Sequence, residues 1–178
     1  DEGVVLTFDD GSAVAFDKVV FACHVDQALA LLGAPTNDER RLLGTWKYKD
    51  GRVLVHRDHS AFPARPLMQA YTFLYTEREG VFDTSVSGAL WHEPGVSKSC
   101  DMISSQHPNF PVREDLVEMD TVLRTPVFDF DSCATIPELK GLNGVGNTFY
   151  CGSYFGYGLH EDAVRSAADV ARSLGVEV

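Results

Sequence analysis

The sequence N-T-F-Y-C-G-S-Y-F-G-Y-G-L-H-E-D occupies residues 147–162 and determines the structure expected for the C-terminal region. It begins with β-prone residues and continues into a glycine-rich stretch, which favours a turn. Apolar or small side chains then recur at helical spacing: Ala163, Val164, Ala167, Ala168, Ala171 and Leu174. The pattern predicts a strand, a turn and a helix that ends at Gly175. The free N–H groups in the first turn of such a helix can receive an anion or an electron-rich ring edge.

The beginning of the chain predicts a hairpin and then a buried strand. Two β-rich runs, residues 4–8 and 13–16, flank the sequence D-D-G-S, and an Asp-Gly pair between such runs is a hairpin signal. Residues 19–23 form a continuous apolar run, V-V-F-A-C, which is typical of a strand buried on both faces.

Both regions resemble flavin-containing amine oxidases and related bacterial NAD/FAD-binding proteins. Residues 149–152 match Phe-x-x-Gly at the strand end, and residues 158–163 match the Gly-x-x-Glu-x-Ala that leads into the outgoing helix. The hairpin followed by Asp-x-Val-Val-x-Ala, here residues 17–22, is a second and independent likeness to the way these proteins leave their cofactor domain. The chain departs from the family pattern at Ser153, where a cofactor-contacting Glu is usual, and at Asp162, where a Gly is usual.

The resemblance implies an α+β fold in which a mostly antiparallel sheet of a flavoprotein substrate domain is joined to parts of an FAD-binding domain and a C-terminal helix. Residues 1–35 and 127–178 would belong to the FAD-binding domain, and residues 36–126 would form the substrate-type sheet domain. It also implies FAD, contacted at its pyrimidine edge, and a small organic substrate oxidised by hydride transfer to the flavin. The residues expected to contact the cofactor are Gly152, Ser153, Gly158, Leu159, His160 and Glu161. The sequence names no catalytic residue.

A phosphate-binding turn for the dinucleotide is missing from this pattern. Such a turn, G-x-G-x-x-G, follows a strand and opens a helix, whereas the glycines of residues 141–146 precede a strand. We therefore expect a partial flavoprotein that an N-terminal Rossmann half would complete. The alternative is a non-enzymatic remnant or interaction module, which dimerises or binds a partner chain through apolar surface near residues 19–23 and along the last helix.

Short helices and strands are expected between these two regions. One helix should run from Asp26 to Leu32 and end at Gly33, and a second should open with a capping box of Thr36 and Glu39. Antiparallel strands are expected at residues 46–49, 53–56, 68–76 and 81–89, with a turn at Asp50-Gly51.

The stretches after these strands carry weaker signals. Residues 93–111 predict a polar, irregular loop. Residues 114–124 fit either a strand or a short helix, and residues 134–139 fit a single helical turn.

Charge and composition exclude several classes of partner. The net charge of −11 argues against nucleic acid and anionic membrane surfaces. No apolar run approaches the roughly 20 residues of a membrane span, and the N-terminal D-E-G sequence lacks the features of a signal peptide. We therefore expect a cytoplasmic protein with reduced, mostly buried cysteines, because no C-x-x-C spacing links Cys23, Cys100, Cys133 and Cys151.

Other groups of reactive residues favour structural roles. His56-Arg-Asp-His59 holds two imidazoles, but residues at this spacing on a strand face opposite ways, so no metal site is expected. A structural or substrate-facing role for His56 and Asp58 is preferred, because similar relatives carry His-x-Asp at a strand end. Cys23-His24 lacks an orienting third group, which argues against a cysteine hydrolase. Core packing is favoured over a substrate cavity for most of the aromatic residues Trp46, Tyr48, Tyr71, Phe73, Tyr75 and Trp91.

Overall fold

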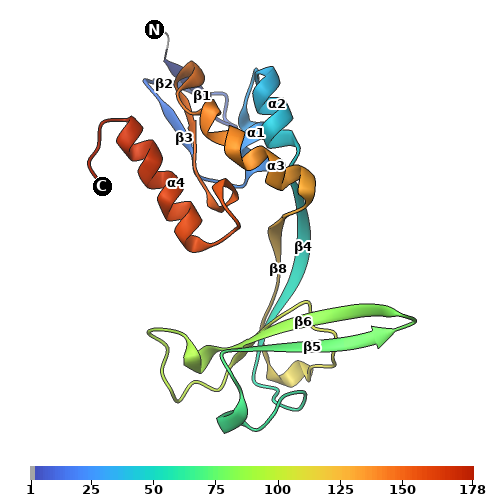
Figure 1. The fold of residues 1–178 in the computed structure, drawn as a ribbon. Helices are drawn as coiled ribbons and strands as arrows, with labels where there is room; N and C mark the ends of the chain where they lie inside the picture. Colours follow the sequence, from blue (N-terminus) through green and yellow to red (C-terminus); the bar gives the residue numbers. More distant parts are fainter. Residues whose placement is uncertain (1–2) are drawn as a thin grey trace. The chain divides into compact units, whose positions relative to one another are not determined.

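The computed structural model describes residues 3–178, so the first two positions of the D-E-G sequence lie outside the described residues. The chain is α+β, with mostly antiparallel pairing in its sheets, which confirms the predicted fold class. It divides into two compact units (Figure 1). The first contains the described residues up to Lys49 together with Pro126–Val178, and the second contains Asp50–Thr125.

The first unit carries two small sheets and the helices that pack beside them. Its elements are β1 (Val4–Thr7), β2 (Ala13–Phe16), β3 (Val19–Phe21), α1 (Val25–Leu31), α2 (Asn37–Gly44), α3 (Phe130–Leu139), β9 (Thr148–Tyr150) and α4 (His160–Ser173). β1 pairs with β2 antiparallel, and β3 pairs with β9 in parallel. The predicted hairpin is confirmed, and the Asp10 carboxylate closes its turn by accepting the Ser12 N–H at 2.8 Å.

The expected burial of β3 on both faces is wrong. The Val20 side chain is 43% exposed. A parallel strand is buried on both faces only where helices cover both sides of the sheet. Helices cover both faces of β9, where Phe149 packs with Val170 of α4 and Tyr150 lies in the helical core, but this cover does not extend fully over Val20 on the neighbouring strand.

Capping explains where the helices begin. The Thr36 hydroxyl accepts the Glu39 N–H at 3.1 Å and the Glu39 carboxylate accepts the Thr36 N–H at 2.7 Å, which confirms the capping box of α2. α3 is longer than the expected single turn, because the Asp129 carboxylate caps it at the Ser132 N–H, 2.8 Å away. Leu32 ends α1 in an extended conformation, so the expected glycine cap at Gly33 is wrong.

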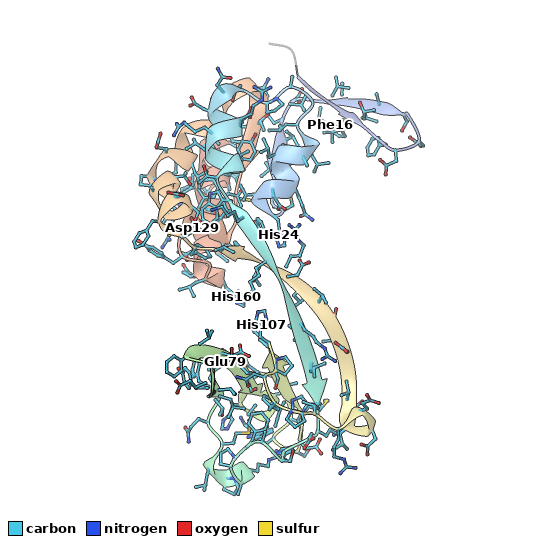
Figure 2. The ribbon with its side chains drawn as sticks, turned by 90° about the vertical axis from the view of Figure 1, so that its right-hand side faces the viewer. Phe16, His24, Glu79, His107, Asp129 and His160 are labelled. Atoms are coloured by element: carbon cyan, nitrogen blue, oxygen red, sulfur yellow. The ribbon has the colours of Figure 1, made fainter. Side chains whose placement is uncertain are left out.

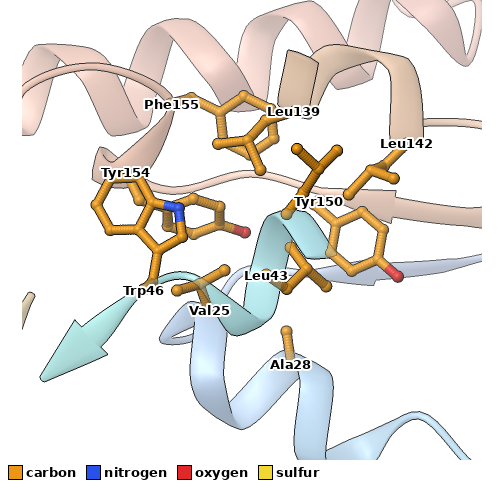
Figure 3. Packing of buried hydrophobic residues seen from close by; sticks show 10 residues of the cluster. Val25, Ala28, Leu43, Trp46, Leu139, Leu142, Tyr150, Tyr154 and Phe155 are labelled. Carbon is orange, nitrogen blue, oxygen red and sulfur yellow. The ribbon is translucent and has the colours of Figure 1, made fainter. Parts of the chain in front are cut away.

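Apolar faces of these helices meet β9 in one core (Figure 3). Its buried members are Val25, Ala28, Leu42, Leu43, Trp46, Leu139, Leu142, Tyr150, Tyr154 and Phe155. The polar atoms of its large rings are partnered in two cases: the Trp46 indole N–H donates to the Thr135 hydroxyl at 3.1 Å, and the Tyr150 hydroxyl donates to Glu39 at 2.6 Å. The core therefore fixes β9 and the turn that follows it.

The C-terminal strand, turn and helix have the predicted form. β9 is followed by a 3-10 turn, Ser153–Phe155, and then by α4. Gly175 adopts φ 84° just after α4, and the Val176 N–H donates to the Ala171 carbonyl, which is the expected glycine-terminated helix end.

The second unit is built on a sheet with the strand order β5-β6-β7-β4-β8. The strands are β4 (Lys47–His56), β5 (Tyr71–Arg78), β6 (Val81–Ala89), β7 (Ile103–Gln106) and β8 (Val117–Val127). One face carries fully buried polar side chains, namely His56, Ser85, Ser87 and Ser105. The other face presents Tyr71, Phe73 and Tyr75, which are more than half exposed, so core packing is the wrong expectation for these three rings.

Three predictions for the middle segment are resolved by this sheet. A turn was expected at Gly51, but β4 runs unbroken through this residue. The glycine lets the His107 ring lie close to the strand, since an added Cβ would be 2.8 Å from the His107 Nε2 atom. The expected loop at residues 93–111 contains β7, whose serines gave no apolar signal. Residues 114–124 fall mostly in β8, so the strand is the correct alternative.

The expected division into cofactor and substrate domains stays a prediction. Contacts within the chain place residues 36–49, which the sequence assigned to the middle domain, in the first unit. α2 and Trp46 belong to the core of that unit, which accounts for their placement.

Candidate functional site

A pocket lies at the carboxyl ends of the parallel strands β3 and β9. Phe21 is paired with Tyr150 in the register, and the Cys151 N–H donates to the Phe21 carbonyl at 3.0 Å. The two strands therefore end side by side, which is where ligands bind in open α/β sheets. The pocket has a volume of about 310 Å³ and is lined by Ala22, Cys23, His24, Gln27, Tyr48, Pro126, Gly152, Ser153, Tyr154 and Ala163.

Gly152 forms part of the pocket wall, and the structure has no room for a side chain at this position. A Cβ on this residue would lie 2.5 Å from the Tyr154 ring. Ser166 of α4 fixes the backbone at this point: its hydroxyl accepts the Gly152 N–H at 2.9 Å and lies 3.2 Å from the Gly152 carbonyl. The strand end is thus held against α4, with Gly152 in the pocket wall.

The thiols and the phenol beside the pocket are neutral at physiological pH. Burial raises the pKa of the thiols of Cys23 and Cys151, and it raises the pKa of the Tyr154 phenol even further. Each of these groups keeps its proton, so the wall is uncharged and suits a neutral ring system.

His24 and Tyr48 form a stacked pair on the other wall. Their ring centroids are 4.6 Å apart at an interplanar angle of 24°. The Tyr48 hydroxyl accepts the Val25 N–H at 2.9 Å, which ties the stack to the start of α1. The Nδ1 atom of His24 is enclosed and has no hydrogen-bond partner among the described residues. Sequence reasoning considered His24 only as a base for Cys23 and missed its place in a pocket.

The expected cofactor-contacting residues divide between the pocket and the turn after it. Gly152 and Ser153 line the pocket, whereas Gly158, Leu159, His160 and Glu161 follow at the start of α4. Figure 2 shows His24 and His160 at the end of the first unit where α1 and α4 begin.

Several donors of the glycine-rich turn are already used inside the chain. The Gly158 N–H donates to the Ser153 carbonyl at 3.1 Å, and the Leu159 N–H donates to the Asp162 carboxylate at 3.1 Å. His160 and Glu161 are the first residues of α4, and their N–H groups have no carbonyl one turn earlier within the helix. These two N–H groups are the ones the turn can offer to a ligand.

Asp162 is the site residue that the sequence analysis noted only as a departure. Its side chain is buried, accepts the N–H groups of Tyr157 and Leu159, and pairs with Arg165. Hydrogen bonds from these two N–H groups, Tyr157 first, lower the pKa of the Asp162 carboxyl. A Cβ at Gly156 would collide with this carboxyl group. The signal was available, because an acidic residue at the third helical position commonly bonds back to the residue before the helix.

Hydrogen bonds within the second unit hold the His56–His59 segment. The His56 Nε2 atom lies 2.9 Å from the Ser105 hydroxyl, and the Asp58 carboxylate accepts the N–H groups of Ser60 and Arg113, each at 2.9 Å. Within residues 3–178 no group of three His, Cys, Asp or Glu side chains is placed to hold a metal ion. The same residues include no helix with the length and apolar character of a membrane span.

Comparisons with known proteins identify a related fold. No protein-family model matches the chain. No curated protein matches it either. It is similar to the crystal structure of a CLA-producing fatty acid isomerase from P. acnes, with 16% identity, a TM-score of 0.56 and coverage of 99% of this chain and 45% of that one. It is also similar to a protein from Exiguobacterium sp. 255-15 assigned as a protoporphyrinogen oxidase, with 13% identity, a TM-score of 0.57 and coverage of 98% and 44%.

These likenesses concern the fold alone. The chain spans less than half the length of either solved structure. Nearly all of this chain is nevertheless included in both matches. The chain thus has the fold of a substantial part of two larger proteins.

Proposed function

We propose that this chain supplies the flavin-ring contacts and the substrate-domain sheet of an FAD-dependent oxidoreductase of the amine oxidase-like class. The complete protein would oxidise a small organic substrate by hydride transfer to the flavin. The observation that carries the proposal is the pocket at the ends of β3 and β9, whose wall includes Gly152 and Ser153 of the flavoprotein-like motif. The assignment of one similar structure as an oxidase supports the reaction class.

The pocket walls fit a flavin ring. They combine small residues, neutral groups and the strand-end backbone at Gly152. When bound, FAD supplies a ring that accepts a hydride and holds two electrons. The N–H groups of His160 and Glu161, at the positive end of α4, would face the negative charge that the reduced ring carries. The Tyr48 and Tyr154 rings would exclude water from the ring.

The phosphates of FAD have no comparable cradle among residues 3–178. Gly144 and Gly146 adopt left-handed conformations, but they lie before β9 rather than between a strand and a helix. In this proposal a Rossmann-type half holds the phosphates, either in the same polypeptide or in a partner chain. The prediction is that this chain recognises the ring and not the adenosine diphosphate part.

A second candidate function is an interaction module, and exposed apolar side chains favour it. Val5 and Phe16 of the hairpin are 63% and 45% exposed, and Val20 of β3 is 43% exposed. Surface of this kind promotes association. Light scattering after size-exclusion chromatography would detect a dimer, and Phe16→Lys should then restore the monomer. A monomer at high concentration would contradict self-association.

Titration with riboflavin tests the main proposal. Riboflavin carries the flavin ring without phosphates, and its fluorescence should be quenched on binding to the intact chain. Ala163→Leu would fill the pocket and should weaken binding at least tenfold. Ala167→Leu makes the same change at an exposed position of α4 and should leave binding unchanged.

Two outcomes would count against this reading. Absence of quenching at millimolar riboflavin would overturn the proposal that the chain contacts the ring. Competition by adenosine diphosphate would mean that the chain holds the phosphate half, which would contradict the division of FAD between this chain and a Rossmann-type unit.

A further inference from the structure

The two ring nitrogens of His24 differ in their surroundings: Nδ1 is enclosed by the protein, and Nε2 is the nitrogen that a ligand could contact. The residue is partly exposed, and its Nδ1 atom is enclosed without a hydrogen-bond partner among the described residues. Because Nδ1 is enclosed, the accessible nitrogen is Nε2, and His24 lines the pocket. The imidazole is therefore a polar group at the pocket wall whose outer nitrogen is available.

The position of Nδ1 determines which nitrogen carries the proton. His24 immediately precedes α1, and the Gln27 side chain accepts its backbone N–H at 3.3 Å. The His24 side chain faces the Gln27 backbone N–H in the capping box of α1, and an N–H beside the ring favours a lone pair there and disfavours another hydrogen. In the neutral imidazole the hydrogen then lies on Nε2, which becomes a hydrogen-bond donor toward the pocket.

Two other polar groups at the pocket are already paired, whereas the enclosed Tyr154 hydroxyl has no hydrogen-bond partner among the described residues. The Tyr48 hydroxyl accepts the Val25 N–H, and the Gly152 N–H donates to Ser166. The stack on Tyr48 also holds the imidazole plane in place, so no side-chain order has to be created when a ligand binds. His24 is consequently a pre-positioned donor.

We propose that His24 donates a hydrogen bond from Nε2 to an acceptor atom on the polar edge of the bound flavin ring, and that it thereby positions the ring in the pocket. This inference rests on the proposed function. A flavin ring offers carbonyl oxygens and ring nitrogens as acceptors, and an Nε2–H group can donate to one of them. His24 is a positioning residue, and no bond is made or broken at it.

The test combines affinity with a direct view of the imidazole. Riboflavin titration of the intact chain is compared with that of His24→Phe, which keeps a ring on Tyr48 but removes both nitrogens. We expect binding to weaken about fivefold to tenfold. His24→Gln retains a donor and should recover part of the loss. His107→Phe is the matched control, because it replaces an exposed imidazole in the second unit.

Long-range ¹H–¹⁵N spectra of the histidine rings supply a readout that a purely structural role would not produce. The free chain should show His24 as the Nε2–H tautomer, and riboflavin should shift the Nε2 signal while the His107 signals stay in place. Equal binding by the parent chain and His24→Phe would overturn the role of His24 and leave the proposed function standing. An Nδ1–H tautomer in the complex would also overturn it. Absence of riboflavin binding by the parent chain would overturn the proposed function and this inference together.

Discussion

Each unit contains a histidine, and the two differ in burial and surroundings. In the second unit His56 is fully buried, its Nε2 atom lies 2.9 Å from the Ser105 hydroxyl, and Ser105 lies 2.7 Å from the Ser87 hydroxyl. In the first unit His24 lines a pocket. The Nδ1 atoms of both histidines are enclosed without a hydrogen-bond partner among the described residues, so the two rings differ in their surroundings: a polar sheet face for His56 and a pocket for His24. Polar groups that satisfy one another stabilise a sheet, whereas a fixed polar group beside a pocket has capacity left for a ligand. The proposal that His24 faces a ligand depends on this difference in surroundings.

Replacing each histidine by alanine should give the largest difference between the units. His56→Ala removes a ring that packs between Phe62 and Phe110 and leaves the Ser105 hydroxyl without its imidazole partner. We expect the free energy of unfolding to fall by about 3 kcal/mol. His24→Ala should cost less than about 1 kcal/mol, because the side chain is partly exposed. Urea unfolding measures both, and equal losses would contradict the comparison.

A methyl group at Gly152 should have the next largest effect. Gly152→Ala would place a Cβ 2.5 Å from the Tyr154 ring, and relieving that clash should cost about 2 kcal/mol. The same change would disturb the pocket wall, so riboflavin binding should also weaken. Gly141→Ala is the matched control, since no atom lies within 4 Å of the added Cβ and stability should change by less than about 0.5 kcal/mol. Thermal unfolding of both variants decides the matter, and similar melting temperatures would contradict the clash.

Local signals in the sequence were sufficient for the first unit. The Asp-Gly hairpin, the Thr36–Glu39 capping box and the strand, turn and α4 were predictable because each depends on residues close together in the chain. β7 was missed because its serines are buried by pairing with Ser87 and by His56, contacts between distant residues that no local pattern reports. The unbroken β4 was missed for the same reason, since Gly51 is explained only by the His107 ring above it.

The pocket was predictable only in part. The motif pointed to Gly152 and Ser153, which line it. His24 lies more than a hundred residues earlier, and only the parallel pairing of β3 with β9 brings it to the same wall. The N–H groups of residues 158–161 were expected to be free, but the Ser153 carbonyl accepts that of Gly158 and the Asp162 carboxylate accepts that of Leu159, through a backbone path that the glycine spacing alone does not specify.

Acid should destabilise the second unit through His56. Burial lowers the pKa of His56 below its ordinary value of 6.5, whereas the Asp58 carboxylate opposes this shift and the His59 imidazole adds to it. The unfolded chain therefore binds the proton more tightly than the folded one, and stability falls as the pH drops through 6.5 toward the lowered pKa.

Asp58 does not account for a transition in this range. The Ser60 hydroxyl, together with N–H groups of Arg113 and Ser60, holds the pKa of its carboxyl at about 2, so it stays ionised. Unfolding at pH 7 and pH 5 should show the loss in the parent chain and a smaller loss in His56→Gln. An unchanged pH dependence in that variant would assign the transition to another group.

The smallest expected effect concerns the donors that Asp162 occupies. Its carboxylate accepts the N–H groups of Tyr157 and Leu159, next to the N–H groups of His160 and Glu161 that α4 offers to a ligand. Asp162→Asn removes a negative charge from the positive end of the helix, while its amide oxygen can still accept these N–H groups. Riboflavin affinity should therefore rise about threefold, and the rise should be greater for the reduced ring, which carries negative charge. Asp169→Asn removes an equal charge from a carboxylate that pairs with Lys140 and Arg172 further along α4, so it should leave the affinity unchanged. If both variants raised the affinity equally, net charge rather than the local N–H donors of the turn would govern ring binding. The turn of the first unit would then, like the second unit, offer no unpaired donors to a ligand.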